Sequence, residues 1–184
     1  MNSWWYVWDN ELSSEDCNAI LGLYGSQVKQ KGQVGNSNTD KKIRSSEVVG
    51  LPYGTKECNT LDSIIGKYIN MANKECFGFQ LNNIKEFQIA QYADKGFYDE
   101  HMDTRIDETA SQRKLSVTVQ LSYPDEYKGG DFEFTKGIPT PDSSTIRTRG
   151  TIIVFPSFLY HKVTPVTDGT RHSLVGWYEG NKWR

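Results

Sequence analysis

The sequence of 184 residues has few cysteines and no large excess of either charge. Cys17, Cys58 and Cys76 are an odd number and have no CxxC spacing, which argues against a disulfide framework or a structural zinc site and favours a reducing compartment. The net charge of -2 provides no basic surface typical of proteins that bind nucleic acid or an anionic membrane. We therefore expect a small molecule or a peptide as the partner.

The sequence also lacks long apolar runs. No stretch reaches the roughly 18 consecutive apolar residues that a membrane-spanning helix needs. The start, MNSWWYVWDN, is aromatic but lacks the basic region of a signal peptide. The length of the whole sequence is typical of one domain. We expect a single cytoplasmic domain over residues 1–184, with no nucleic acid and no membrane as partner.

The periodicity of apolar residues changes near residue 80. The first 80 residues are predicted to be helical support, with a capped helix after Ser13 and a second helix over 57–76. Residues 31–46 are rich in Gly, Asn, Ser and Lys, which indicates a mobile loop. We expect a lid over the substrate around residues 31–50.

From Ile84 onward the period is two, which predicts strands. The expected strands are 84–92, 97–103, 115–122, 130–135, 151–155 and 171–178. Residues 135–150 are expected to form an exposed loop or an irregular hairpin. The predicted fold class is mostly β with N-terminal helices, and its β core over about 84–180 is a jelly-roll or cupin-like double-stranded β-helix.

Three residues form a candidate metal site. In a strand, His101 and Asp103 would face the same side, and His161 follows 58 residues after Asp103, behind an apolar strand. Two histidines and one carboxylate that leave other positions open are the facial triad of non-haem Fe(II) oxygenases. An HxD pair alone also occurs by chance. His172, the third histidine, should face away from its neighbours and is excluded.

Arg171 is a candidate anchor for an anion. Strand alternation places Arg171, Ser173, Val175 and Trp177 on one face of the last predicted strand. An arginine that faces into a barrel is costly unless it meets an anion, and a guanidinium binds a carboxylate in bidentate fashion. Ser173 could donate to the same carboxylate. The alternative is a solvated strand-edge arginine paired with Asp or Glu.

These residues carry a resemblance to the Fe(II)- and 2-oxoglutarate-dependent oxygenases, particularly the prolyl 4-hydroxylase-like group. The matching segments are QYADKGFYDEHMD, RKLSVTVQLSYPDEYKGGDFEF and GTIIVFPSFLYHKVTPVTDGTRHSLVGWYEG. They cover about residues 84–180 in the family's order. Two segments, PDEYKGGDFEF and HKVTPVTDGTR, are most similar to bacterial PKHD-type hydroxylases.

The resemblance implies roles for individual residues. His101, Asp103 and His161 match the catalytic iron ligands. Arg171 and Tyr92 match residues that bind 2-oxoglutarate, with Ser173 beside them. The matches to substrate-binding residues are Tyr98, Trp177, Arg44, Ser46 and Arg113.

The resemblance also implies the reaction and its cofactors. The cofactors would be Fe(II), 2-oxoglutarate and O2, with ascorbate as a further one. The implied activity is hydroxylation of peptidyl proline with decarboxylation of 2-oxoglutarate to succinate and CO2. Alternatives are a hydroxylase of a free amino acid or other small metabolite, and a non-catalytic cupin-like metal-binding module. Gln120 departs from the prolyl hydroxylases, which tend to have Tyr there, and this leaves the substrate open.

Overall fold

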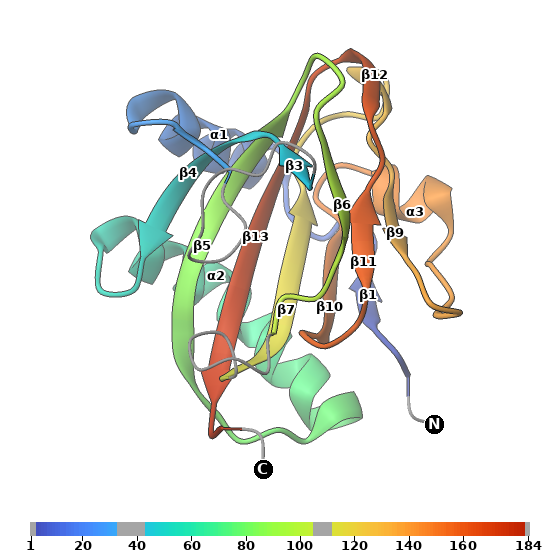
Figure 1. Ribbon diagram of the computed structural model, residues 1–184. Helices are drawn as coiled ribbons and strands as arrows, with labels where there is room; N and C mark the ends of the chain where they lie inside the picture. The colour runs from blue at the N-terminus through green and yellow to red at the C-terminus, as the bar shows by residue number, and fades with distance from the viewer. Residues whose placement is uncertain (1–2, 33–42, 105–111, 183–184) are drawn as a thin grey trace.

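The computed structural model describes residues 3–32, 43–104 and 112–182. Two antiparallel sheets form the body of the protein, and helices cover the outer side of the larger sheet (Figure 1). This arrangement confirms the predicted class, a mostly β jelly-roll core with N-terminal helices.

The sheets are assembled from strands that are distant in sequence. Among the described residues the larger sheet has the order β1 (Tyr6–Trp8), β10 (Ile152–Pro156), β7 (Arg113–Gln120), β13 (Arg171–Gly180), β5 (Leu81–Tyr92), β4 (Glu47–Pro52) and β2 (Gln30–Lys31). The smaller sheet has the order β3 (Arg44–Ser45), β6 (Phe97–His101), β11 (His161–Val163) and β9 (Phe132–Phe134). A separate pair joins β8 (Tyr127–Gly129) and β12 (Val166–Gly169).

Two helices cover the outer face of the larger sheet. Helix α1 (Ser14–Ser26) begins where the Ser13 hydroxyl accepts a hydrogen bond from the Asp16 amide, as the sequence predicts. Helix α2 (Lys56–Ala72) is capped in the same way by Thr55 and continues into a π-helical turn, η1 (Asn73–Phe77). In the described part of the chain, no helix has the length and apolar composition that crossing a bilayer would require.

The outer core lies between these helices and the sheet. Its largest fully buried side chains include Leu61, Ile65 and Ile69 of α2, which meet Phe87 and Ile89 of β5. The α2 residues recur at helical spacing, so they form one apolar stripe. Burying a side chain of this size stabilises the fold by about 1.5–3 kcal/mol. Packing of this core holds the larger sheet in place, and the inner face of the sheet is thereby held in position.

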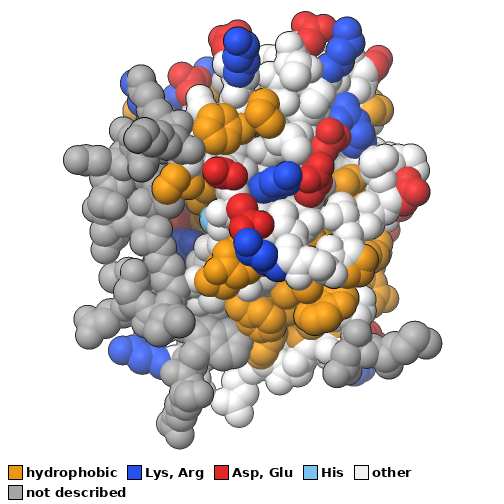
Figure 2. All heavy atoms as spheres, turned by 45° about the vertical axis from the view of Figure 1, so that its right-hand side comes forward, with side chains coloured by type: hydrophobic (Ala, Val, Ile, Leu, Met, Phe, Trp, Pro, Cys, Tyr) orange, Lys and Arg blue, Asp and Glu red, His pale blue; other side chains and the backbone are white. Residues whose placement is uncertain are grey.

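Alternation along the strands gives the two sheets different inner and outer faces. In β13, Leu174 and Tyr178 point to the outer core, whereas Arg171 and Trp177 line an internal pocket. On the smaller sheet the outward residues are charged: the Lys162 Nζ and a Glu133 carboxylate oxygen lie 3.0 Å apart. Figure 2 shows side chains of both charges beside one another on that face. The pocket therefore lies between the inner faces of the two sheets.

Gly176 provides space for the outer core at the centre of the larger sheet. It pairs with Phe87, and a Cβ atom on Gly176 would lie 2.5 Å from the Phe87 ring. We expect Gly176→Ala to lower the free energy of unfolding by about 1–3 kcal/mol, because the buried ring has no room to move. Urea denaturation measures the change. Gly50→Ala in β4 is the matched control, because nothing lies within 4 Å of its Cβ position, and equal losses in the two variants would contradict this account.

The N-terminal part of the chain contains more strand than predicted. Besides the helices, residues 1–80 contribute β1, β2, β3 and β4. Strand β4 is short, but it pairs along its whole length with β5, and this long-range pairing creates it. Of the predicted loop over 31–46 and the lid over 31–50, residues 33–42 lie outside the described residues. The described ends of these segments include residues of strands β2, β3 and β4.

Two further segments differ from the sequence-based expectation. The segment 135–150 contains a helix, α3 (Ser143–Arg147), which begins where the Asp142 side chain accepts a hydrogen bond from the Ser144 amide. Strands β8, β11 and β12 were not predicted, because three or four residues are too few to show a period of two.

Candidate metal centre and its pocket

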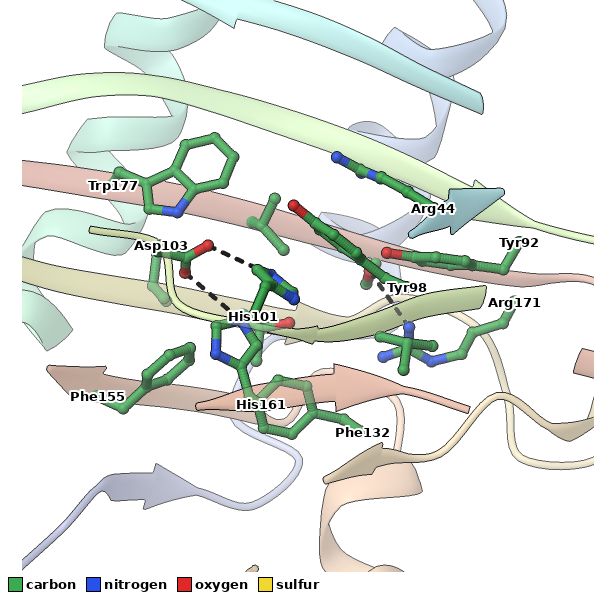
Figure 3. Close-up of a pocket in the computed structure, with 15 residues that line it drawn as sticks. Arg44, Tyr92, Tyr98, His101, Asp103, Phe132, Phe155, His161, Arg171 and Trp177 are labelled. Atoms are coloured by element: carbon green, nitrogen blue, oxygen red, sulfur yellow. Dashed lines mark hydrogen bonds and ion pairs between the residues drawn. The ribbon is translucent and has the colours of Figure 1, made fainter. Parts of the chain in front are cut away.

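The three residues of the predicted triad come from neighbouring strands of the smaller sheet. His101 ends β6, Asp103 follows two residues later, and His161 begins β11. The two strands pair so that His161 lies opposite His101. One ligand atom from each side chain lies within 4.8 Å of the other two, and Figure 3 shows the side chains grouped together. The fold therefore brings together three groups that are typical metal ligands.

Each imidazole has one nitrogen at a backbone carbonyl. His101 Nδ1 lies 2.8 Å from the Asp99 oxygen, and His161 Nδ1 lies 2.9 Å from the Leu159 oxygen. A carbonyl can only accept, so both Nδ1 atoms carry a proton, and in the neutral form of each ring the lone pair is on Nε2. Each Nε2 is 3.6 Å from an Asp103 carboxylate oxygen. Both histidines are thus oriented to present Nε2 to one ion, as metal-binding histidines usually are.

The protonation states also suit a metal. Burial lowers the pKa of His161 to about 4, although Asp103 opposes this shift, so the imidazole is neutral at pH 7. Burial raises the pKa of the Asp103 carboxyl, but the imidazoles of His161 and His101 outweigh burial and hold that pKa below its ordinary value. A neutral imidazole and an ionised carboxylate are the forms that bind a cation.

Ser116 on β7 orients the carboxylate. Its hydroxyl lies 2.7 Å from Asp103 Oδ2 and 2.9 Å from the Ser157 hydroxyl. The Ser157 carbonyl accepts a hydrogen bond from the Asp103 amide at 2.9 Å. The side chain of Asp103 is therefore held by Ser116 of the larger sheet, and its backbone is held by Ser157 in the turn after β10.

We expect Ser116→Ala to weaken Fe(II) binding by about 10- to 100-fold, the range for groups that orient metal ligands. The three ligands remain, but Asp103 loses the hydroxyl donor that fixes its carboxylate. Anaerobic calorimetry with Fe(II) measures the affinity. Ser63→Ala on the exposed side of α2 is the matched control, and an unchanged affinity in Ser116→Ala would remove this role.

A buried cation lies in the same pocket as the triad. Arg171 is 3% exposed, and its Nη1 lies 3.5 Å from the Ser173 hydroxyl. Its guanidinium lies 5.7 Å from the centre of the Tyr92 ring. Among the described residues no carboxylate forms an ion pair with Arg171, so the alternative of an exposed arginine paired with Asp or Glu does not hold there. A buried guanidinium without an anion fits a ligand that brings a carboxylate.

Glycines shape the wall beside this arginine. Gly129 and Gly130 both have positive φ angles, of 66° and 64°. A Cβ on Gly130 would lie 2.8 Å from Val166 and 3.1 Å from the Arg171 side chain. The glycine pair therefore allows the turn after β8 to pass close to Arg171.

The predicted substrate residues fall into two groups around the triad. In the first, the Tyr98 ring stacks on His101 with centres 3.5 Å apart, and the Arg44 guanidinium carbon lies 4.5 Å from the centre of the Tyr98 ring. Arg44 Nε donates to the Ser46 hydroxyl at 2.7 Å. Arg44 and Tyr98 line the triad's pocket, whereas Ser46 lines the neighbouring groove.

In the second group, Arg113 is already engaged within the protein. Its guanidinium lies 4.0 Å from the Trp177 ring, and its Nη2 lies 3.2 Å from a Glu86 carboxylate oxygen. Its Nη1 is 3.4 Å from the Asp103 carbonyl oxygen. Trp177 lines the pocket, and its buried Nε1 has no hydrogen-bond partner among the described residues. Arg113 thus contacts both Trp177 and Asp103. A contact between Arg113 and the substrate stays a prediction.

Sequence reasoning missed several residues of the site. The Phe155 ring lies 4.9 Å and the Phe132 ring 5.6 Å from the His161 ring, and Ser116 binds Asp103. A weak signal exists for Ser116, because Ser116, Thr118 and Gln120 alternate with the apolar residues Leu115, Val117 and Val119. His172 lies elsewhere, as predicted: its ring packs 5.3 Å from that of Tyr24.

Comparison with known proteins gives a consistent result. The sequence model of the 2OG-Fe(II) oxygenase superfamily matches residues 87–179. A PKHD-type hydroxylase of Crocosphaera subtropica is 32% identical over 92% of this chain and 75% of its own length. One from Prochlorococcus marinus is 37% identical over 90% of this chain and 66% of its own length.

Solved structures share the fold at low sequence identity. A prolyl-4-hydroxylase of Pseudomonas putida aligns with a TM-score of 0.75 at 19% identity, covering 97% of this chain and 94% of that one. A prolyl hydroxylase of Trichoplax adhaerens, in complex with a peptide fragment of hypoxia inducible factor, aligns with a TM-score of 0.76 at 18% identity. That alignment covers 97% of this chain and 84% of the other.

Proposed function

Because the chain belongs to the 2OG-Fe(II) oxygenase superfamily, we propose that it hydroxylates peptidyl proline with Fe(II), 2-oxoglutarate and O2. When bound, the iron and 2-oxoglutarate supply the activation of O2: one oxygen atom enters a C–H bond of the substrate, and the other enters succinate as CO2 leaves. The protein's own residues bind, orient and shield these groups.

The observation that carries the proposal is the triad beside a buried arginine that has no ion-pair partner among the described residues. His101 Nε2, His161 Nε2 and an Asp103 carboxylate oxygen would hold the iron. This donor set suits Fe(II), whereas structural zinc sites usually have four protein ligands with Cys among them. Arg171 would bind the far carboxylate of 2-oxoglutarate, with Ser173 and Tyr92 beside it. The residues present therefore fit both groups.

Apolar side chains line much of the triad's pocket. Phe132, Phe155, Val163 and Trp177 are each buried and line the same pocket. A dry pocket protects a reactive oxidant and strengthens the electrostatic hold on charged ligands. Tyr98 contributes a ring stacked on His101, and burial raises the pKa of its hydroxyl to about 12, so that it stays protonated.

Two observations support a peptide as the substrate. Arg44 and Ser46 keep the Arg-x-Ser spacing, and they lie where the pocket meets a groove lined by Lys31, Gln91 and Asp94. The Trichoplax adhaerens structure, which has this fold, was solved with a peptide fragment. A free amino acid or other small metabolite is the second candidate, favoured by the confined space around the triad and by the positive charge of Arg44.

The test is incubation with Fe(II), 2-oxoglutarate, O2 and proline-containing peptides. We expect succinate in proportion to peptide hydroxylation, and peptides heavier by the mass of one oxygen atom. Omission of 2-oxoglutarate is the control. Succinate formed with small amino acids but no peptide would favour the second candidate, whereas metal binding without any succinate would identify a non-catalytic cupin-like module.

A further inference from the structure

We propose that the substrate presents a carboxylate to Arg44, close to the carbon that is oxidised, an inference that rests on the proposed function. Arg44 is 6% exposed, although it belongs to β3 at the edge of the smaller sheet. Figure 3 shows its side chain running beside Tyr98, with the guanidinium directed toward the side of the pocket where Trp177 lies. The cation therefore belongs to the pocket rather than to the surface.

The described residues use only part of the hydrogen-bonding capacity of Arg44. Its Nε is used by the Ser46 hydroxyl at 2.7 Å, and one face of the guanidinium covers the Tyr98 ring. No described carboxylate lies within ion-pair distance of Arg44. A guanidinium fixed at Nε still presents its two Nη groups as a fork, the geometry that binds a carboxylate.

Charge balance in the pocket indicates the sign of the ligand. The two charges of Fe(II) and the charge of Arg171 would be matched by Asp103 together with the two carboxylates of 2-oxoglutarate. Among the described residues Arg44 then remains as the surplus cation, because Arg113 is already paired with Glu86. A buried charge without a counter-ion is costly. An anionic substrate group would remove that cost, and the carbonyl of an internal peptide bond would not.

The backbone is shaped around this arginine. A Cβ atom on Gly32 would lie 2.5 Å from Arg44 Nε and equally close to the Ser46 hydroxyl. The Gly32 amide donates to the Ser46 carbonyl at 2.8 Å, which holds the two segments together. Gly32 thus leaves the space that the guanidinium occupies, and any larger residue would displace it.

Two distances in the pocket limit the separation between the substrate carboxylate and the carbon that is oxidised. The Arg44 guanidinium carbon lies 4.5 Å from the centre of the Tyr98 ring, and that centre lies 3.5 Å from the centre of the His101 ring. A carboxylate on Arg44 would therefore be only a few bonds from a carbon placed at the metal. The carboxylate and the C–H bond would belong to the same residue or to adjacent ones, either in a free amino acid or in a peptide with a terminal or side-chain carboxylate.

Matched acid and amide probes test the proposal. Anaerobic protein loaded with Fe(II) and 2-oxoglutarate is titrated with three pairs of probes, each an acid and its amide. The first pair is L-proline and L-prolinamide, and the second is a peptide that ends in proline with a free carboxylate or with an amide. The third pair is a peptide that contains Asp-Pro and one that contains Asn-Pro. Calorimetry measures binding without turnover. We expect at least one acid to bind about tenfold or more tightly than its amide, because a charge-assisted pair is replaced by a neutral one.

Variants connect that preference to Arg44. Arg44→Gln should abolish the preference for the acid, Arg44→Lys should keep part of it, and Gly32→Ala should reduce it. Lys128→Gln, which removes an exposed cation on β8, should leave it intact. Acids and amides that bind equally to the wild-type protein, or a preference that survives in Arg44→Gln, would overturn the proposal. Selective acid binding without succinate formation would defeat the proposed function and leave the role of Arg44 standing.

Discussion

His161→Ala is expected to abolish succinate formation. The substitution removes one of three ligands, so Fe(II) affinity should fall by more than the roughly 100-fold that follows loss of an orienting group. His161 is 6% exposed and its ring packs against Phe155, which leaves no other described donor in its place. Anaerobic calorimetry measures the metal affinity, and succinate assays measure turnover.

His172 is a suitable control for this experiment. It is the third histidine of the chain, and it packs against Tyr24 outside the pocket. His172→Gln should therefore keep both Fe(II) binding and succinate formation. If His161→Ala retained turnover at high Fe(II) while folded, the assignment of His161 as a ligand would be withdrawn.

Arg171→Gln is expected to weaken 2-oxoglutarate binding by about 100-fold or more. Removing one partner of a buried ion pair costs about 3–5 kcal/mol, and each 1.4 kcal/mol is a factor of ten in affinity. Fe(II) affinity should stay unchanged, because Arg171 lies beside Tyr92 and Ser173 rather than at the triad. The visible absorption band of the anaerobic Fe(II)–2-oxoglutarate complex measures the affinity for the cosubstrate.

Arg171→Lys separates charge from geometry at this position. The ammonium keeps the charge but cannot form a bidentate fork, so the affinity should be intermediate. Equal 2-oxoglutarate affinity in the wild-type protein and Arg171→Gln would show that the cosubstrate is anchored elsewhere.

The local parts of the site were predictable from short spacings. Strand alternation predicts that His101 and Asp103 face the same side and that Arg171 shares a face with Ser173 and Trp177. The structure places each set on one pocket, although Asp103 lies just beyond the end of β6. The types of the three residues suggested a shared metal site, and the resemblance to a family supported it, but nothing in the spacing alone predicts that His161 pairs with His101.

Residues that act through tertiary contacts were not predictable. Ser116 is one polar residue in a buried strand, and its role depends on the turn that brings Ser157 and Asp103 beside it. Arg113 matched a substrate residue, yet its partners Glu86 and Trp177 come from two other strands. Strand β4 was likewise missed, because its existence depends on pairing with β5 rather than on its own composition.

The pairing of His161 with His101 has a consequence for how the fold is held together. An ion bound there would act as a cross-link between β6 and β11, closing the long stretch of chain that separates them. Ligands that bind only the native state add to its stability by mass action, by about 2.7 kcal/mol at a free concentration 100 times the dissociation constant. Metal supply would therefore contribute to the stability of the fold as well as occupy the site.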